Sequence, residues 1–152
     1  MEDSRRHRRS RLGARALEGA EGLKLLLDTH VWLWHLLEPE RLSRRAASAL
    51  EGPDAELYLS PLSIWETLLL AEKGRIALDP EPITWCRDAL RTAPLIAAEL
   101  THDVAMRSRQ LDGFHGRDPI DRFLVATCLV AEMTLVTRDA AIRRYRRIRT
   151  LW

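Results

Sequence analysis

Short, almost wholly apolar runs separated by longer helical patterns recur along this chain from Leu23 onwards. The first run, residues 23–27 (LKLLL), is typical of a strand that is buried on both faces, as the strands of parallel sheets are. Further candidate strands lie at residues 56–59, 95–98, 134–137 and 148–152. Because strands that alternate with helices favour parallel sheets, the pattern predicts an α/β fold with a mostly parallel sheet of four to five strands.

Capping residues and prolines indicate where the helices between these strands begin and end. Ser60-Pro61 predicts a helix that runs to Lys73, and Asp118-Pro119 predicts a long apolar helix to about Glu132. Asp79-Pro80 is expected to start another helix. The remaining helices are expected after Asp28 to about Pro39, from Ser43 to Gly52, from Thr101 to about Gln110 and over residues 140–145.

The chain has 152 residues, of which 46% are hydrophobic and 30% charged, so it is long enough for one folded domain. Residues 1–22 are rich in Arg, Gly and Ala and are expected to form a basic, flexible extension, which leaves residues 23–152 as the domain. The net charge of +2 conceals a separation of charges. Acids outnumber bases over residues 23–137, whereas residues 138–152 are rich in Arg.

Cysteine usage and hydropathy indicate the compartment. Cys86 and Cys128 form no CxxC pair and no cysteine framework, which favours a reducing environment. The longest uncharged apolar run, residues 123–131, is far shorter than the roughly 20 residues of a membrane helix. We therefore expect a cytoplasmic protein without membrane association.

Four acids stand where burial would make a negative charge costly. Asp28 directly follows the first strand, and Asp139 lies two residues beyond the strand at 134–137. Glu66 and Asp121 lie on helices among apolar neighbours. An ionised carboxylate near a core costs several kcal/mol unless it is paired or coordinated. Since bases are few in this part of the chain, we favour convergence of the four acids on a hard divalent cation.

Structural roles remain open for several of these acids. Asp118 is most simply an N-cap, and Asp118-x-x-Asp121 is similar to a capping box that could account for Asp121 as well. Asp28 could cap the helix after the first strand. For Asp139 a cap or turn is about as plausible as a ligand. Glu66, in the middle of a helix, has the weakest structural alternative.

Four stretches and the C-terminal residues carry a resemblance to a known family. From Leu23 to Trp152 the chain resembles PIN-domain proteins, specifically the VapC-type ribonuclease toxins of bacterial type II toxin–antitoxin pairs. The matching stretches are LLLDTHVWLW (25–34), LSPLSIWETLLLAEKGRI (59–76), RDPIDRFLVATCL (117–129), TLVTRD (134–139) and the terminal RTLW (149–152).

The resemblance implies a PIN-like three-layer α/β/α sandwich and an active site of carboxylates that holds Mg²⁺ or Mn²⁺. Carried over residue by residue, it assigns catalysis and metal binding to Asp28, Glu66, Asp121 and Asp139. Asp118 matches an additional acid of one subgroup and is expected to assist at the metal. His115 departs from the spacing of many relatives, since two residues separate it from Asp118, and it receives no assignment.

The function implied is that of a Mg²⁺-dependent endoribonuclease toxin that hydrolyses RNA phosphodiesters. The alternative is a catalytically inactive PIN-like module that binds RNA or protein. A phosphotransferase of the haloacid dehalogenase type ranks low, because Asp28-Thr29-His30 lacks that family's second acid. Phosphate-binding loops of the GxxxxGK[ST] or GxGxxG type are absent.

The resemblance also implies a VapB-type antitoxin and a homodimer. Arg143, Arg144 and Arg147 are candidate RNA-binding residues, although a solvated polar helix explains such a charge run equally well. Trp32 and Trp34 are two residues apart on one helix, so they cannot both be buried by one core. One of them is therefore a candidate for a contact with the second subunit or the antitoxin.

Overall fold

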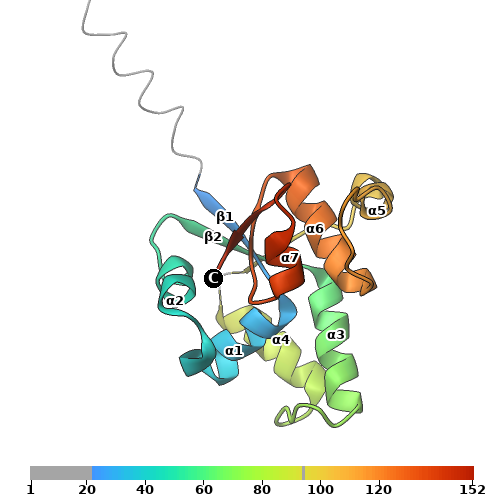
Figure 1. The fold of residues 1–152 in the computed structure, drawn as a ribbon. Coiled ribbons are helices and arrows are strands. Elements are labelled where there is room, and N and C mark those ends of the chain that lie inside the picture. Colours follow the sequence, from blue (N-terminus) through green and yellow to red (C-terminus); the bar gives the residue numbers. More distant parts are fainter. Residues whose placement is uncertain (1–21, 94) are drawn as a thin grey trace, which may run out of the picture.

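The computed structural model describes residues 22–93 and 95–152 and shows a five-stranded sheet flanked by helices (Figure 1). The sheet has the strand order β3-β2-β1-β4-β5, and all neighbouring strands are parallel. The strands are β1 (Leu23–Leu27), β2 (Ala55–Leu59), β3 (Leu95–Ala97), β4 (Thr134–Val136) and β5 (Arg149–Leu151). The helices are α1 (Thr29–Leu37), α2 (Arg44–Leu50), α3 (Pro61–Glu72), α4 (Pro82–Thr92), α5 (His102–Ser108), α6 (Pro119–Ala131) and α7 (Ala140–Arg144), with a 3-10 turn η1 (Pro39–Arg41). The predicted α/β class and parallel sheet are confirmed.

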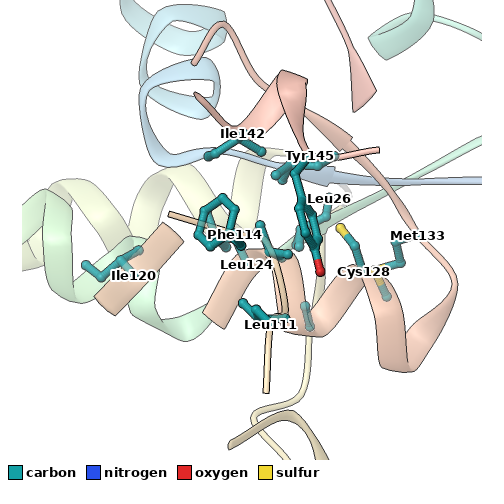
Figure 2. Packing of buried hydrophobic residues seen from close by; sticks show 12 residues of the cluster. Leu26, Leu111, Phe114, Ile120, Leu124, Cys128, Met133, Ile142 and Tyr145 are labelled. Atoms are coloured by element: carbon teal, nitrogen blue, oxygen red, sulfur yellow. The ribbon is translucent and has the colours of Figure 1, made fainter. Parts of the chain in front are cut away.

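Two hydrophobic cores lie on opposite faces of the sheet, because successive side chains of the central strand β1 point to opposite sides. Leu26 packs with residues of α6 and α7, among them Leu124, Cys128 and Ile142 (Figure 2). Leu25 and Leu27 pack on the other face against α1, α2 and α4. The predicted three-layer α/β/α arrangement follows from this alternation.

Most helix starts agree with the sequence, and one prediction was wrong. Ser60 Oγ accepts a hydrogen bond from the backbone N–H of Leu62 at 3.2 Å, and Pro61 opens α3. The helix expected at Asp79-Pro80 begins instead at Pro82. The physical reason is that Glu81 is the N-cap, since its carboxylate accepts hydrogen bonds from the first free N–H groups of α4.

The crevice that matters for function lies at the carboxyl ends of β1 and β4. β1 is flanked by β2 on one side and by β4 on the other, which is the point of an open parallel sheet where ligands usually bind. The backbone N–H of Asp28 donates to the carbonyl oxygen of Val136 at 3.1 Å. This bond places the chain leaving β1 next to the chain leaving β4.

The sequence also predicted a flexible N-terminal extension and no membrane association. The expected basic extension over residues 1–22 lies, apart from Gly22, outside the described residues. Within the described ranges, no helix is both long and apolar enough to cross a membrane.

Candidate active site

A pocket of about 340 Å³ opens at the carboxyl ends of β1 and β4. All five carboxylates singled out in the sequence reach it, although they come from distant parts of the chain. Its lining consists of Asp28, His30, Val31, Trp34, Glu66, Asp118, Asp121, Arg138 and Asp139. Parallel topology explains this convergence, because it brings strand ends and the following helix starts to one edge of the sheet.

Asp28 is held at the end of β1 by the hydroxyl of Thr137, the residue that follows β4. Thr137 Oγ1 donates a 2.7 Å hydrogen bond to Asp28 Oδ2. Asp28 occupies the N-cap position of α1, but its side chain makes no capping hydrogen bond, so the structural alternative of a side-chain cap does not apply. Burial raises the pKa of Asp28, and the hydrogen bond from Thr137 opposes this effect.

Glu66 reaches the pocket from the middle of α3. Thr29 Oγ1 lies 2.9 Å from Glu66 Oε2 and also 2.9 Å from Ser63 Oγ, so this fully buried hydroxyl can donate to the carboxylate. Desolvation by burial raises the pKa of Glu66, while the hydrogen bond from Thr29 lowers it. The predicted inward position of Glu66 is confirmed.

Asp121 lies in the first turn of α6, and its acidity is strongly perturbed. Burial, followed by the negative charges of Asp28 and Asp118, raises its pKa to about 7. The adjacent Arg122 does not offset these charges, because its guanidinium donates to the carbonyl oxygens of Ser108 and Gly116. Arg122 therefore anchors the loop before α6 rather than pairing with Asp121.

Asp118 and Asp139 combine the two roles that the sequence left open. Asp118 Oδ1 accepts from the backbone N–H of Ile120 at 2.9 Å, and Asp139 Oδ1 accepts from that of Ile142 at 2.9 Å. Both residues are thus N-caps, of α6 and α7 respectively, and both also line the pocket. In both residues the capping hydrogen bond uses Oδ1, so Oδ2 takes no part in it.

Compensation of the negative charge inside the pocket is incomplete. The two ion pairs found in residues 22–93 and 95–152 are Arg41–Glu38 and Arg91–Asp88, and neither involves a pocket carboxylate. The N-termini of α1, α6 and α7 meet the pocket and favour nearby negative charge. Even so, the raised pKa values of Asp28, Glu66 and Asp121 indicate a surplus of repulsion and desolvation.

The donor set fits a hard divalent cation in its chemistry, because five carboxylates line one pocket. Its spacing is not that of a closed coordination site. Over the described part of the chain, no three His, Cys, Asp or Glu side chains are arranged so that they could hold a metal ion. Asp28, Glu66, Asp118 and Asp139 each direct one oxygen towards a protein donor.

The sequence analysis assigned no place in the pocket to four further lining residues: His30, Val31, Trp34 and Arg138. The sequence could have indicated a place in the pocket for Arg138, because this residue lies between the end of a predicted strand and Asp139. Trp32 is fully buried and Trp34 is only partly buried, as their spacing required. The predicted RNA-binding residues Arg143, Arg144 and Arg147 are exposed and lie outside the pocket lining, as does the exposed His115.

Comparison with known sequences identifies relatives. The PIN domain family matches residues 25–148 of this chain. Ribonuclease VapC22 of Mycobacterium tuberculosis (strain ATCC 25618 / H37Rv) is 35% identical over 130 residues, which cover 84% of this chain and 98% of that protein.

Comparison with solved structures supports the same fold. VapBC2 of Rickettsia felis bound to a promoter DNA fragment matches with a TM-score of 0.62 and 12% identity, covering 84% of this chain and 97% of the other. A toxin–antitoxin complex from Klebsiella pneumoniae matches with a TM-score of 0.55 and 22% identity, covering 81% and 93%.

Proposed function

This chain belongs to the PIN-domain family, and from that premise we propose that it is a Mg²⁺-dependent endoribonuclease acting as the toxin of a toxin–antitoxin pair. The observation that carries the proposal is the convergence of five carboxylates, from the ends of two strands and the starts or middles of two helices, on one pocket. Its relative VapC22 bears the name ribonuclease and is matched over nearly its whole length.

In this proposal Asp28, Asp121 and Asp139 would hold one or two divalent cations. Glu66 would be a further ligand or the base that orients water, and Asp118 would be an auxiliary ligand. When bound, Mg²⁺ or Mn²⁺ supplies a Lewis acid that stabilises charge on a phosphodiester and lowers the pKa of water. The negative pocket is suited to this role, because a cation relieves the repulsion that raises the pKa of Asp121.

The protein's own groups would orient the reactants. Glu66 has a raised pKa and a hydrogen bond from Thr29 that fixes its direction, so it can accept a proton from an attacking water. Thr137 keeps Asp28 at the strand end. RNA would be held by exposed arginines that follow Asp139 in the chain, namely Arg143, Arg144 and Arg147. A single-stranded or looped substrate has the accessible backbone that such a pocket requires.

A VapB-type antitoxin and a homodimer complete the proposal. Support for the partner comes from the structural neighbours, which are described as VapBC and toxin–antitoxin complexes. Residues 23–152 would form the nuclease domain in this arrangement, in line with the PIN match over residues 25–148.

One observation favours the alternative of a catalytically inactive binding module. The carboxylates of the described residues are not spaced to hold a metal ion as they stand. A module of this kind would bind RNA or a partner protein without cleaving RNA, and Mg²⁺ would not alter its behaviour.

Incubation of the purified full chain with total RNA separates the two functions. We expect internal cleavage with Mg²⁺, none with EDTA, and recovery when excess Mg²⁺ is restored. Asp28→Asn should abolish cleavage while leaving the fold intact, whereas Asp54→Asn, at an exposed position outside the pocket, should cleave like the wild type. Intact RNA in every reaction, or full activity of Asp28→Asn, would overturn the nuclease proposal.

A further inference from the structure

Three residues of the pocket lining differ in chemistry from the carboxylates. They are Trp34 and His30 of α1 and Arg138, which follows β4. The rings of His30 and Trp34 have their centroids 5.9 Å apart at an interplanar angle of 54°. The pocket lining therefore combines carboxylates with an aromatic pair and an arginine.

Trp34 is held in place by groups from three other segments. The guanidinium of Arg41 lies 4.6 Å from the centre of the Trp34 ring, and Trp152 packs against it with centroids 5.9 Å apart. The guanidinium of Arg138 lies 6.0 Å from the ring, at the outer limit of a cation–π contact. These contacts keep the indole at the pocket wall while leaving it partly exposed.

Arg138 is available to a ligand although it stands among acids. It is exposed, and in the described ranges no ion pair forms between Arg138 and a carboxylate of the pocket. An arginine in this position can meet a phosphate or stack on a planar base. A cation bound by the carboxylates would reduce the attraction between them and Arg138 still further.

A ligand that matches both kinds of lining residue needs an anionic group and a flat aromatic group within the length of one pocket. A nucleotide unit of single-stranded nucleic acid has this composition, and stacking of bases on aromatic side chains is a general means of binding such strands. We propose that Trp34, together with His30 and Arg138, forms a nucleobase-binding subsite that accepts one unpaired base next to the phosphate at the carboxylates. This inference rests on the proposed ribonuclease function and names a specificity-determining residue for it.

The test measures binding of a fluorescein-labelled ten-nucleotide single-stranded RNA of mixed sequence to the full chain with Mg²⁺, in an Asp28→Asn background that prevents cleavage. A second set of the same RNA carries one abasic nucleotide at each position in turn. Trp34→Ala should weaken binding of the intact RNA by about 5- to 150-fold, which is the usual range for loss of one base stack. An abasic nucleotide at one position should remove most of that difference, and Trp34→Phe should retain most of the affinity.

A matched control and a second variant keep the test decisive. Trp65→Ala, on α3 and 56% exposed outside the pocket lining, should bind like the parent. Trp34→Leu preserves apolar packing against Trp152 without a stacking face, so it replaces Trp34→Ala if circular dichroism shows that the alanine variant is unfolded.

The outcomes distinguish the subsite from the proposed function. If the wild type cleaves RNA but Trp34→Ala and Trp34→Leu bind it like the parent, the subsite is wrong and the ribonuclease function stands. An equal loss on intact RNA and on every abasic RNA also overturns the subsite, since Trp34 would then act through something other than a base. If the wild type cleaves no RNA and the parent binds none, both proposals fall.

Discussion

Thr137 Oγ1 donates a 2.7 Å hydrogen bond to Asp28 Oδ2 across 109 positions of the sequence. Thr137 Oγ1 also accepts a hydrogen bond from the backbone N–H of Asp139 at 3.0 Å. A single hydroxyl therefore links the acid after β1 to the segment that carries the acid after β4. This link makes Thr137 a positioning residue for the carboxylate pocket.

Replacement of this hydroxyl should affect stability and activity together. Thr137→Val keeps the shape of a fully buried side chain but removes the donor to Asp28. We expect a loss of about 1–2 kcal/mol in the free energy of unfolding, because a buried acceptor loses its partner. RNA cleavage should fall by about 10-fold or more, the usual effect of losing a group that orients a metal ligand.

Thr137→Ser is the matched control, since it restores the hydroxyl. Urea unfolding and initial cleavage rates of the two variants check the prediction. A valine variant that cleaves RNA at the wild-type rate would show that the hydrogen bond does not position Asp28.

The acidity of Asp121 predicts how the metal-free protein responds to pH. Its pKa is raised from 3.8 to about 7, so the folded state holds this proton more tightly than the unfolded state does. Asp121 therefore makes stability decrease as the pH rises from about 4 to 7, and its contribution is level above that range. We expect an effect of about 1–2 kcal/mol, because partial solvent exposure screens the charges.

Denaturant unfolding in EDTA at pH 5 and pH 8 measures this effect. Asp121→Asn should be more stable than the wild type at pH 8 and should show a flatter dependence on pH. If the free energy of unfolding of Asp121→Asn differs between pH 5 and pH 8 as much as that of the wild type does, another group is responsible for the pH dependence.

Divalent cations should stabilise the folded chain if the carboxylates bind them. Addition of Mg²⁺ at 100 times its Kd would raise the free energy of unfolding by about 2.7 kcal/mol. A thermal unfolding series with Mg²⁺, Mn²⁺ and EDTA should show a higher Tm with either cation in the wild type and in Asp54→Asn. Asp28→Asn should lose most of the shift, and an equal shift in all three proteins would place the cation elsewhere.

The arginines after Asp139 should control the salt dependence of RNA binding. Each phosphate contact to a single strand contributes a slope of roughly 0.7 in a plot of log affinity against log salt concentration. Replacement of Arg143, Arg144 and Arg147 by Ala should reduce the slope by about 2. The exposed residues Arg75, Arg87 and Arg107 provide the control triple, which should leave the slope unchanged. Equal slopes for the two triple variants would argue for a solvated helix without RNA contacts.

Much of this fold could be predicted because its signals are local. The buried run LKLLL forms β1 with its last three residues fully buried, and Asp28 follows it at the sheet edge where the pocket lies. Ser60-Pro61 began a helix as expected. The predicted start of α4 was wrong because Pro80 and Pro82 lie close together and either could begin a helix. The hydrogen bonds that Glu81 accepts as N-cap make Pro82 the first residue of α4.

The acids that line the pocket could be predicted from the sequence, but the pocket positions of Trp34 and Arg138 were not predicted. Asp28 and Asp139 could be found because they follow predicted strands, and Glu66 and Asp121 because their neighbours on the helix are apolar. From the sequence, Trp34 was a candidate only for a contact with a second subunit or the antitoxin, and Arg138 had no predicted role. Their contact at 6.0 Å depends on how α1 lies against the segment after β4, which only the tertiary packing determines.

The most direct measurement of the central claim compares two acids on one helix. Glu66 and Glu72 both belong to α3, but Glu66 lines the pocket whereas Glu72 is exposed outside it. The initial rate of RNA cleavage is measured over a range of Mg²⁺ concentrations for Glu66→Gln, Glu72→Gln and the wild type. A carboxylate-dependent nuclease predicts a loss of at least about 100-fold for Glu66→Gln, in line with removal of a group that stabilises the transition state, and wild-type rates for Glu72→Gln. Equal rates for the two variants would contradict the account.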